Sequence, residues 1–510
     1  MPWLTIVTFV PLVGVPVLLA GRGMRDEVAR SIALFVAVAT FVASLGIYGR
    51  FEAADAGFQM VERAVWIRSL GISYALGVDG VSLWMVLLTT FLFPLAILAS
   101  WKVDRNVRLY MISMLVLECG VLGTFLALDL LLFFVFFEAI LVPMYLIIGG
   151  WGGERRVYAA VKFFLYTMAG SAFLLVAILF LYAKSGRLPG GATFYLPDLV
   201  RLALPAGTAR WLFLAFLVAF AVKVPIFPLH TWLPDAHTEA PTAGSVILAG
   251  VMLKVGAYGL IRFNLALFPE ASRHFAGFIS VLALIGIVYG ALVALIQTDI
   301  KRLVAYSSVS HLGFVVLGIF AFTNQGVTGA VLQMVNHGLS TGALFLLVGM
   351  VYERTHTRDL GSMGGLASVM PWLTGAFLFA VFASAGLPGL NNFVGEFLVI
   401  VGSFSANVAF GSIASIAVVL GAIYLLWSYQ RMAYGPVHEE HRMLPDVSVR
   451  EVAVLAPVLA LLLVFGVYPK VLTDRIGPTT QAVVRHVAPD HPVESGPEAV
   501  QLADVGGSNP

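Results

Sequence analysis

Cysteine is nearly absent from this chain of 510 residues: Cys119, within an apolar run, is the only one. One thiol forms no disulfide within the chain, and it cannot supply the several thiolates that an iron–sulfur cluster or a structural zinc site needs. The ten histidines show no HxxH or HExxH spacing on an expected helix. No metal site is therefore expected in the chain.

Nucleotide-binding motifs are absent as well. There is no GxGxxG after a strand, no GxxxxGKS and no GxxxxGKT, so the chain is not expected to hold a dinucleotide or a nucleotide. The net charge of +2 says little about partners, and nothing in the chain supports binding to nucleic acid.

Charged residues are scarce, at 11 per cent, whereas hydrophobic residues make up 60 per cent and the mean hydropathy is +0.94. No soluble globular chain tolerates this composition. Apolar stretches of about 20 residues recur, and each is long enough to cross a bilayer as a helix. The fold class is therefore expected to be an all-α polytopic membrane protein, with the lipid bilayer as its solvent.

The apolar runs predict about fourteen transmembrane helices. The first has no basic residues before it, so we expect a retained helix rather than a signal peptide. Boundaries of this kind carry an error of about 2–4 residues. The predicted spans are 3–20, 31–49, 81–100, 107–127, 129–149, 160–183, 211–233, 241–262, 275–297, 301–320, 327–352, 371–405, 410–431 and 451–469.

Two of these spans are interrupted. Pro225 and Pro228 remove backbone donors from the seventh helix, which must break just after Lys223. The twelfth contains GLPGLNNFVGEF (386–397), in which glycine and proline break the helix and two asparagines are suited to cap a new one. Irregular backbone at membrane depth persists only where it is buried or lines a wet cavity.

Paired interruptions in two halves of a chain indicate inverted repeats around a transport site. The pattern accordingly predicts two inverted five-helix repeats. The expected parts are 1–106 with helices 1–3, 107–262 with helices 4–8, 275–431 with helices 9–13, 451–470 with helix 14, and 471–510 as a polar C-terminal tail.

The basic residues predict the orientation. An even number of spans puts both termini on one side, and most basic residues of the short loops fall on the other side. By the positive-inside rule these loops are expected to be cytoplasmic and both termini periplasmic. The basic residues concerned include Arg22, Arg25, Lys102, Arg105, Arg155, Arg156, Lys301, Arg302, Arg354 and Arg442.

Four charges within apolar runs are the leading site candidates: Lys223, Lys254, Glu138 and Glu396. A charge at mid-bilayer depth costs about 2.5–3.5 kcal/mol even on lenient insertion scales, so one that persists usually marks an ion or proton path. Glu396 is expected near the start of a new half-helix, where free amide groups stabilise an anion. The purely structural alternative is that these charges only pair or snorkel and are dispensable.

The remaining candidates are weaker. His311 and His337 lie on separate apolar helices near Ser and Thr and fit a proton relay, although a membrane histidine is often a hydrogen-bonded core residue. His230 lies beside the prolines of the first break. Glu118 lies in an apolar run, where a structural role is as plausible as a functional one.

The chain resembles the antiporter-like membrane subunits of respiratory complex I, which are homologous to Mrp-type cation/proton antiporters. The motifs are LLFFVFFEAILVPMYLIIGGWGG, KVPIFPLHTWLPDAHTEAPTAGSVILAGVMLKVGAYGL, KRLVAYSSVSHLGF and GLPGLNNFVGEF. Within the family Glu396 favours the M-type branch, which includes mitochondrial subunit 4, because L- and N-type paralogues usually carry lysine there. An Mrp-type Na⁺/H⁺ antiporter subunit and a membrane subunit of a membrane-bound hydrogenase share these motifs and remain alternatives.

The resemblance implies roles for particular residues. Glu138 matches the fifth-helix glutamate that pairs with a lysine, and Lys223 matches the seventh-helix lysine of the input half-channel. Lys254 matches the central lysine, Glu396 the terminal acid of the output half, and His311 and His337 polar residues between them.

The resemblance also implies a setting. The chain would be a proton-translocating subunit of an NADH:quinone oxidoreductase, without redox chemistry of its own. NAD, FMN, Fe–S clusters and quinone would belong to partner subunits. The nearest partners would be the L- and N-type subunits, and the location a bacterial inner membrane.

Overall fold

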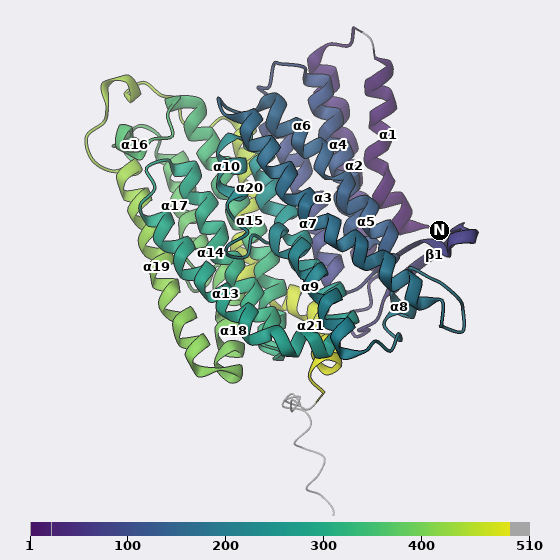
Figure 1. The fold of residues 1–510 in the computed structure, drawn as a ribbon. Helices are drawn as coiled ribbons and strands as arrows, with labels where there is room; N and C mark the ends of the chain where they lie inside the picture. The colour runs from purple at the N-terminus through teal and green to yellow at the C-terminus, as the bar shows by residue number, and fades with distance from the viewer. Residues whose placement is uncertain (1, 22, 490–510) are drawn as a thin grey trace, which may run out of the picture.

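The computed structural model describes residues 2–21 and 23–489 and is nearly all helix (Figure 1). In these residues thirteen helices are long and apolar enough to span a membrane. They are α1 (Trp3–Ala20), α2 (Asp26–Arg50), α3 (Gly80–Ala99), α4 (Val107–Leu126), α5–α6 (Leu130–Ala139 and Leu141–Trp151), α7 (Arg156–Ser185), α9 (Ala206–Lys223), the Thr242–Leu265 helix, α13 (Pro269–Leu295), α14 (Ile300–Phe320), α15 (Asn324–Thr355), α19 (Val408–Ala433) and α20 (Val449–Val467).

Fourteen spans are predicted, and the one that is missing from these thirteen is the interrupted twelfth span. It consists of two shorter helices, α17 (Pro371–Ser384) and α18 (Asn391–Ala406). Gly386 and Gly389 between them adopt φ values of +75° and +93°, which glycine reaches without a side-chain penalty. The predicted all-α membrane fold is therefore confirmed. The inverted symmetry of the two halves remains a prediction.

The seventh span is interrupted where the prolines predict. Helix α9 ends at Lys223, and α10 (Trp232–Glu239) follows after an irregular segment. The Trp232 indole donates a hydrogen bond of 2.9 Å to the carbonyl oxygen of Val222, so a carbonyl at the broken end has a partner. Irregular backbone is held here inside the bundle.

The two asparagines of the second break do not cap α18, contrary to the sequence prediction. They are its first two residues, and their side chains bind α15 instead. Asn391 and Asn336 each donate an amide N–H to the other's carbonyl oxygen, at 3.0 and 2.7 Å. Asn392 donates to Ser340 Oγ at 3.1 Å. The tertiary contact outcompetes the local one because α15 supplies buried polar groups that would otherwise lack partners.

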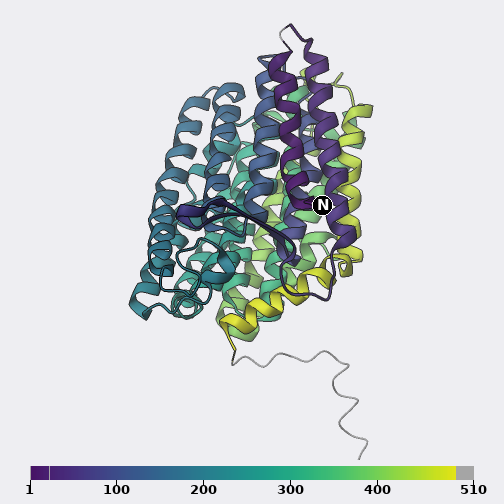
Figure 2. The same cartoon turned by 90° about the vertical axis from the view of Figure 1, so that its right-hand side faces the viewer.

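The connection between α2 and α3 contains two β-strands. Within the long connection 50–80, β1 (Gln59–Ile67) and β2 (Ile72–Val78) form an antiparallel hairpin with Ala64 opposite Tyr74. Figure 2 shows it lying across the helices near α1. The segment 50–80 has no apolar run long enough to span a bilayer, so the sequence predicts only a connection here and no hairpin.

The two ends of the bundle differ. The turn between α1 and α2 and the short helix α16 (Leu366–Val369) lie at one end, whereas α8 (Leu196–Leu199) and α21 (Lys470–Val487) lie at the other (Figure 1). We call these the loop end and the terminus end. Helix α21 forms the first part of the expected polar tail and lies across the terminus end (Figure 2). Arg22 and residues 490–510 lie outside the described residues.

The centre of the bundle is formed by the helices that carry the buried charges. In α15 and in the Thr242–Leu265 helix, all residues of the most apolar 18-residue stretch are buried, compared with 33% in α1, α2, α19 and α20. The outer helices therefore shield the central ones from the membrane.

Candidate functional site

The helix that carries Lys254 is distorted on both sides of the lysine. The segment α12 (Leu253–Gly259) lies between two π-helical segments, η2 (Leu248–Met252) and η3 (Leu260–Leu265). π-Helical turns are rare and occur frequently at functional sites. Lys254 is fully buried, and its ammonium group donates to the carbonyl oxygen of Ala249 in the preceding segment.

A chain of polar side chains leads from Lys254 into the second half of the molecule. Lys254 Nζ lies 2.7 Å from Nδ1 of His337 on α15. The ring centroid of His337 lies 5.8 Å from that of His311 on α14. His311 Nδ1 lies 2.8 Å from Oε1 of Glu396 on α18. The four predicted residues therefore lie in sequence across four central helices, and we call them the buried relay.

Glu396 is held by side chains. It is the sixth residue of α18, so it lies beyond the first helical turn, where the sequence analysis expected free amide groups to stabilise it. Its Oε1 accepts instead from Gln333 Nε2 at 2.9 Å and lies next to His311. A Cβ atom added to Gly386 would come within 3.1 Å of Oε2. The break thus provides room for the carboxylate.

Lys223 and Glu138 do not touch. Among the described residues they form no ion pair within 4 Å, and neither Lys223 Nζ nor Glu138 Oε1 has a hydrogen-bond partner. Lys223 is 2% exposed and its Nζ lies 4.7 Å from the ring centroid of Phe137, a cation–π distance. The two charges still interact electrostatically. The pairing of these two residues that the resemblance implies is thus an interaction through space and not a hydrogen-bonded ion pair.

Lys223 packs directly against the helix that carries Lys254. A Cβ atom added to Gly256 would lie 2.8 Å from Cβ of Lys223. This close approach places the end of α9 against α12, two residues beyond Lys254 in the chain. In the part of the chain that the structure describes, no side-chain hydrogen bond joins the two lysines.

Two further groups near Lys254 were not singled out as strong candidates. His237 on α10 is fully buried, stacks on Phe345 at 4.7 Å, and has no hydrogen-bond partner on either ring nitrogen among residues 2–21 and 23–489. Lys301 was assigned to a loop, but it is buried, and its Nζ donates to the carbonyl oxygen of Ala240. Both Lys254 and Lys301 interact electrostatically with His237. Because Lys301 lies beside a short basic loop, nothing in the sequence indicates that its side chain is buried.

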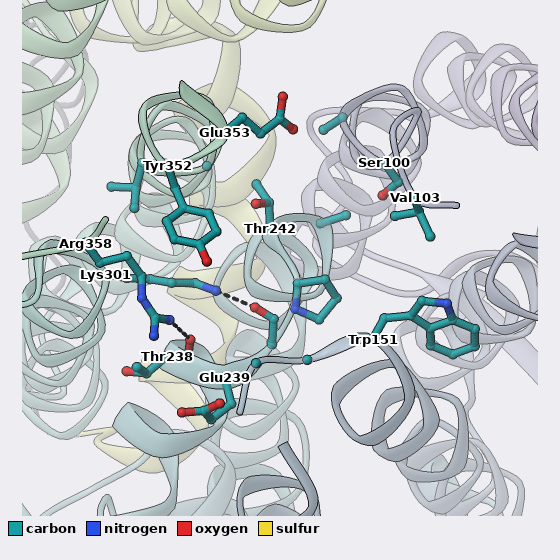
Figure 3. Close-up of a pocket in the computed structure, with 18 of the residues that line it drawn as sticks. Ser100, Val103, Trp151, Thr238, Glu239, Thr242, Lys301, Tyr352, Glu353 and Arg358 are labelled. Carbon is teal, nitrogen blue, oxygen red and sulfur yellow. Dashed lines mark hydrogen bonds between the residues drawn. The ribbon is translucent and has the colours of Figure 1, made fainter. Parts of the chain in front are cut away.

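A cavity of about 690 Å³ at the loop end reaches Lys301. Figure 3 shows Lys301 and Arg358 on one side of this cavity, with their hydrogen bonds to the carbonyl oxygens of Ala240 and Thr238, and Trp151 across from them. Lys102 and Glu353, which form an ion pair of 2.7 Å, also line it. We call this cavity the vestibule.

The two weaker candidates lie apart from the relay. The His230 ring stacks on Phe227 and meets Tyr289 edge-on, with ring centroids 5.6 and 5.2 Å away. Glu118, on α4, is fully buried, and neither carboxylate oxygen has a hydrogen-bond partner among the described residues. In the described part of the chain, no hydrogen bond or ion pair joins either residue to Lys254. Across the same described ranges, no three His, Cys, Asp or Glu side chains cluster as a metal site.

Known proteins resemble the chain over nearly its full length. The family described as "NADH:quinone oxidoreductase/Mrp antiporter, TM" matches residues 127–421, and "NADH-ubiquinone oxidoreductase chain 4, amino terminus" matches residues 56–129. NADH-quinone oxidoreductase subunit M of Rhodobacter capsulatus is 47% identical over 96% of this chain and 97% of its own length. NADH-ubiquinone oxidoreductase chain 4 of Marchantia polymorpha is 42% identical over 93% and 96%.

Solved structures agree. A chain of respiratory complex I from Thermus thermophilus with bound NADH superposes with a TM-score of 0.87 at 33% identity, covering 95% of this chain and 99% of that one. A chain of the Mrp complex from Dietzia reaches 0.82 at 21% identity, covering 96% and 98%, which is a likeness of fold alone.

Proposed function

The chain belongs to the family of NADH-quinone oxidoreductase subunit M, the antiporter-like membrane subunits of complex I, and from this premise we propose how its buried residues move protons. It is a multi-pass membrane subunit of a proton-translocating oxidoreductase and has other complex I subunits as partners. The alternatives of an Mrp antiporter or a hydrogenase subunit are less well supported, because the curated relatives at 40–47% identity are complex I subunits.

The buried relay is the observation that carries the proposal. Lysine, histidine and carboxylate each gain and lose a proton, and neighbouring members at 2.7–2.8 Å can exchange one directly. A proton on Lys254 passes to His337, then to His311 and finally to Glu396. The longer step between the two rings, at 5.8 Å between centroids, requires a ring movement or an intervening water. This step is where transfer would be controlled.

The vestibule is the proposed source of the protons that reach Lys254. It brings solvent from the loop end to Lys301, and both Lys301 and Lys254 are close enough to His237 to interact with it electrostatically. An unpaired imidazole in that position accepts a proton from one side and gives it to the other after a ring flip. Lys301 and His237 therefore join the proposed path, ahead of Lys254.

Lys223 and Glu138 regulate the relay rather than belong to it. A proton gained or lost at Glu138 changes the field at Lys223, and Lys223 packs beside the segment that carries Lys254. Charges within a low-dielectric interior influence one another strongly over such distances. The pair thus couples events elsewhere in the complex to proton loading at Lys254.

The cofactors are proposed to lie in partner subunits. NAD, FMN, Fe–S clusters and quinone perform the electron transfer there, and this chain performs only proton translocation. We place L- and N-type subunits as the neighbours, a bacterial inner membrane as the location, the loop end in the cytoplasm and both termini in the periplasm, following the basic residues of the short loops.

The test is proton pumping by the assembled complex in membrane vesicles. Glu396→Gln keeps the shape and one hydrogen-bonding oxygen but cannot accept a proton. We expect proton translocation to fall at least about tenfold, as for loss of a proton-transfer group, with NADH oxidation lowered through coupling. Glu396→Lys, which can still load and release a proton, should retain part of the activity. Wild-type pumping by Glu396→Gln would reduce Glu396 to a structural role.

A further inference from the structure

A deep apolar groove lies on the outer surface of the terminus-end half of the bundle. Its walls come from α2, α3, α15 and α20, and Val471 at the start of α21 closes one end. Aromatic side chains dominate, including Phe41, Trp84 and Phe465, and the volume is about 480 Å³. None of the buried charges of the relay lines it.

Two hydrogen-bond donors at this groove lack a partner among the described residues. Trp84 lines the groove, is 6% exposed, and its indole N–H has no acceptor. Arg475, one turn after Val471 on α21, has an unpaired Nε. A buried donor without an acceptor costs about 1–3 kcal/mol, so an occupant that supplies acceptors gains that energy.

The two donors are linked by a continuous series of ring contacts. The Arg475 guanidinium lies 4.1 Å from the ring centroid of Tyr48, which itself lines the groove. The rings of Tyr48 and Trp84 are 5.9 Å apart, and those of Trp84 and Phe465 are 6.0 Å apart. The groove therefore runs from a cation, past an indole donor, into a purely apolar interior.

We propose that this groove binds one anionic phospholipid, with an acyl chain in the groove, an ester oxygen near the Trp84 N–H and the phosphate at Arg475. Helix α21 lies across the terminus end of the bundle, where lipid headgroups are located (Figure 2). Lys470 on the same helix and Arg50 at the end of α2 are exposed and add positive charge to that of Arg475, whereas the exposed acids Glu52, Asp55 and Asp474 lie in the same stretches of the chain.

The size of the groove favours a lipid over a helix of a neighbouring subunit. A helix about 10–12 Å across would lie over a groove of about 480 Å³ and enter it only with its side chains. An acyl chain is slender and fits entirely. An apolar helix face would also leave both donors without acceptors.

The test is photo-crosslinking of the intact complex in nanodiscs. The probes are phosphatidylglycerol and phosphatidylcholine that carry a diazirine on one acyl chain, and mass spectrometry maps the labelled peptides. We expect phosphatidylglycerol to label α2 and α20 residues of the groove at least about fivefold more than phosphatidylcholine, as for a hydrogen bond to a charged group. Arg475→Gln and Trp84→Phe should each reduce that labelling about threefold or more. Ala460→Phe, which fills the groove, should abolish it.

Arg485→Gln is the matched control, because Arg485 lies on the same helix and is exposed. It should leave labelling unchanged. No labelling of the groove in the intact complex would mean that a neighbouring subunit covers it, and would overturn the proposal. Equal labelling by both lipids would show an acyl chain without a headgroup site, and would overturn it as well. The wild-type comparison of the two lipids decides the matter even where a variant fails to assemble.

Discussion

At the residue scale, what distinguishes the members of the site is whether each buried charge has a partner. Lys254, His337, His311 and Glu396 are connected, whereas Lys223 interacts with Glu138 only through space and over an aromatic ring. A lysine without a hydrogen-bonded partner is held in balance by desolvation and by distant charge, so small changes nearby alter its protonation. The lack of a hydrogen-bond partner makes Lys223 costly to bury, and it also makes the protonation of Lys223 sensitive to nearby charges.

Lys223→Ala should abolish coupled proton pumping while the complex still assembles, because Lys254 then loses the charge that controls its loading. Lys223→Arg should also fail, since arginine does not release its proton at physiological pH. Proton uptake by vesicles, measured against NADH oxidation, gives the coupling ratio. Normal pumping in an assembled Lys223→Ala complex contradicts the proposal.

Glu118 provides a contrasting prediction. It is as deeply buried as the relay, but nothing connects it to Lys254, and an isolated carboxyl in an apolar setting is neutral by necessity. Glu118→Gln should therefore pump at close to the wild-type rate, because a neutral amide replaces a neutral acid of the same shape. The measurement is the same coupling ratio. A loss comparable with that of Glu396→Gln would show that a second path runs through α4.

At the scale of the elements, two kinds of broken helix serve different purposes. The break after α9 leaves Lys223 at a helix end, where the negative end of the helix dipole stabilises a cation. The break before α18 instead makes room beside the Glu396 carboxylate, which binds side chains from α14 and α15. The π-helical segments around Lys254 are a third irregularity, and they occur in a helix without proline.

Gly386→Ala tests the second break. Its φ of +75° penalises alanine by roughly 1–2 kcal/mol, and the added Cβ would press on Glu396 Oε2 at 3.1 Å. We expect reduced pumping with modest loss of stability. Gly389→Ala is the control, because it has a similar φ of +93° but nothing within 4 Å of the added atom. Equal defects in the two variants would assign the effect to backbone strain and not to Glu396.

At the scale of the whole molecule, the bundle separates two ends with different properties. The vestibule opens at the loop end among short basic loops, and the hairpin, α8 and α21 lie towards the terminus end. The buried relay runs laterally from the Thr242–Leu265 helix to α18 through the densely packed middle. Such an arrangement allows a proton taken up in one half to leave from the other, so the direction of transport depends on the orientation in the membrane.

The orientation is tested with single cysteines. Cys119 is buried, so it contributes little background to labelling with an impermeant maleimide. Gly190→Cys, in the 184–210 connection, should react on intact cells, whereas Glu154→Cys, in an exposed short basic loop, should react only after the membrane is opened. Both sites have space for the reagent, which makes them comparable. The reverse pattern would invert the proposed topology and the direction of every half-channel.

The class, the approximate spans and both breaks are predictable from the sequence alone, and so are Lys254, His337, His311 and Glu396 as candidate site residues. This is possible because each is a local conflict with an apolar setting: a proline or a charge in a hydrophobic run is visible without knowing its neighbours. The asparagines show the limit of local reasoning, since capping and cross-linking to α15 are equally open to them from the sequence.

Which charges meet depends on the tertiary structure. Pairing depends on distances between helices far apart in the chain, so the contact of Lys254 with His337 and the separation of Lys223 from Glu138 were both out of reach of the sequence. The burial of Lys301 near a loop, the π-helical segments and the groove beside Trp84 were hidden for the same reason. The sequence shows which polar groups lie in apolar runs and are therefore costly to bury, whereas packing determines which partner offsets that cost.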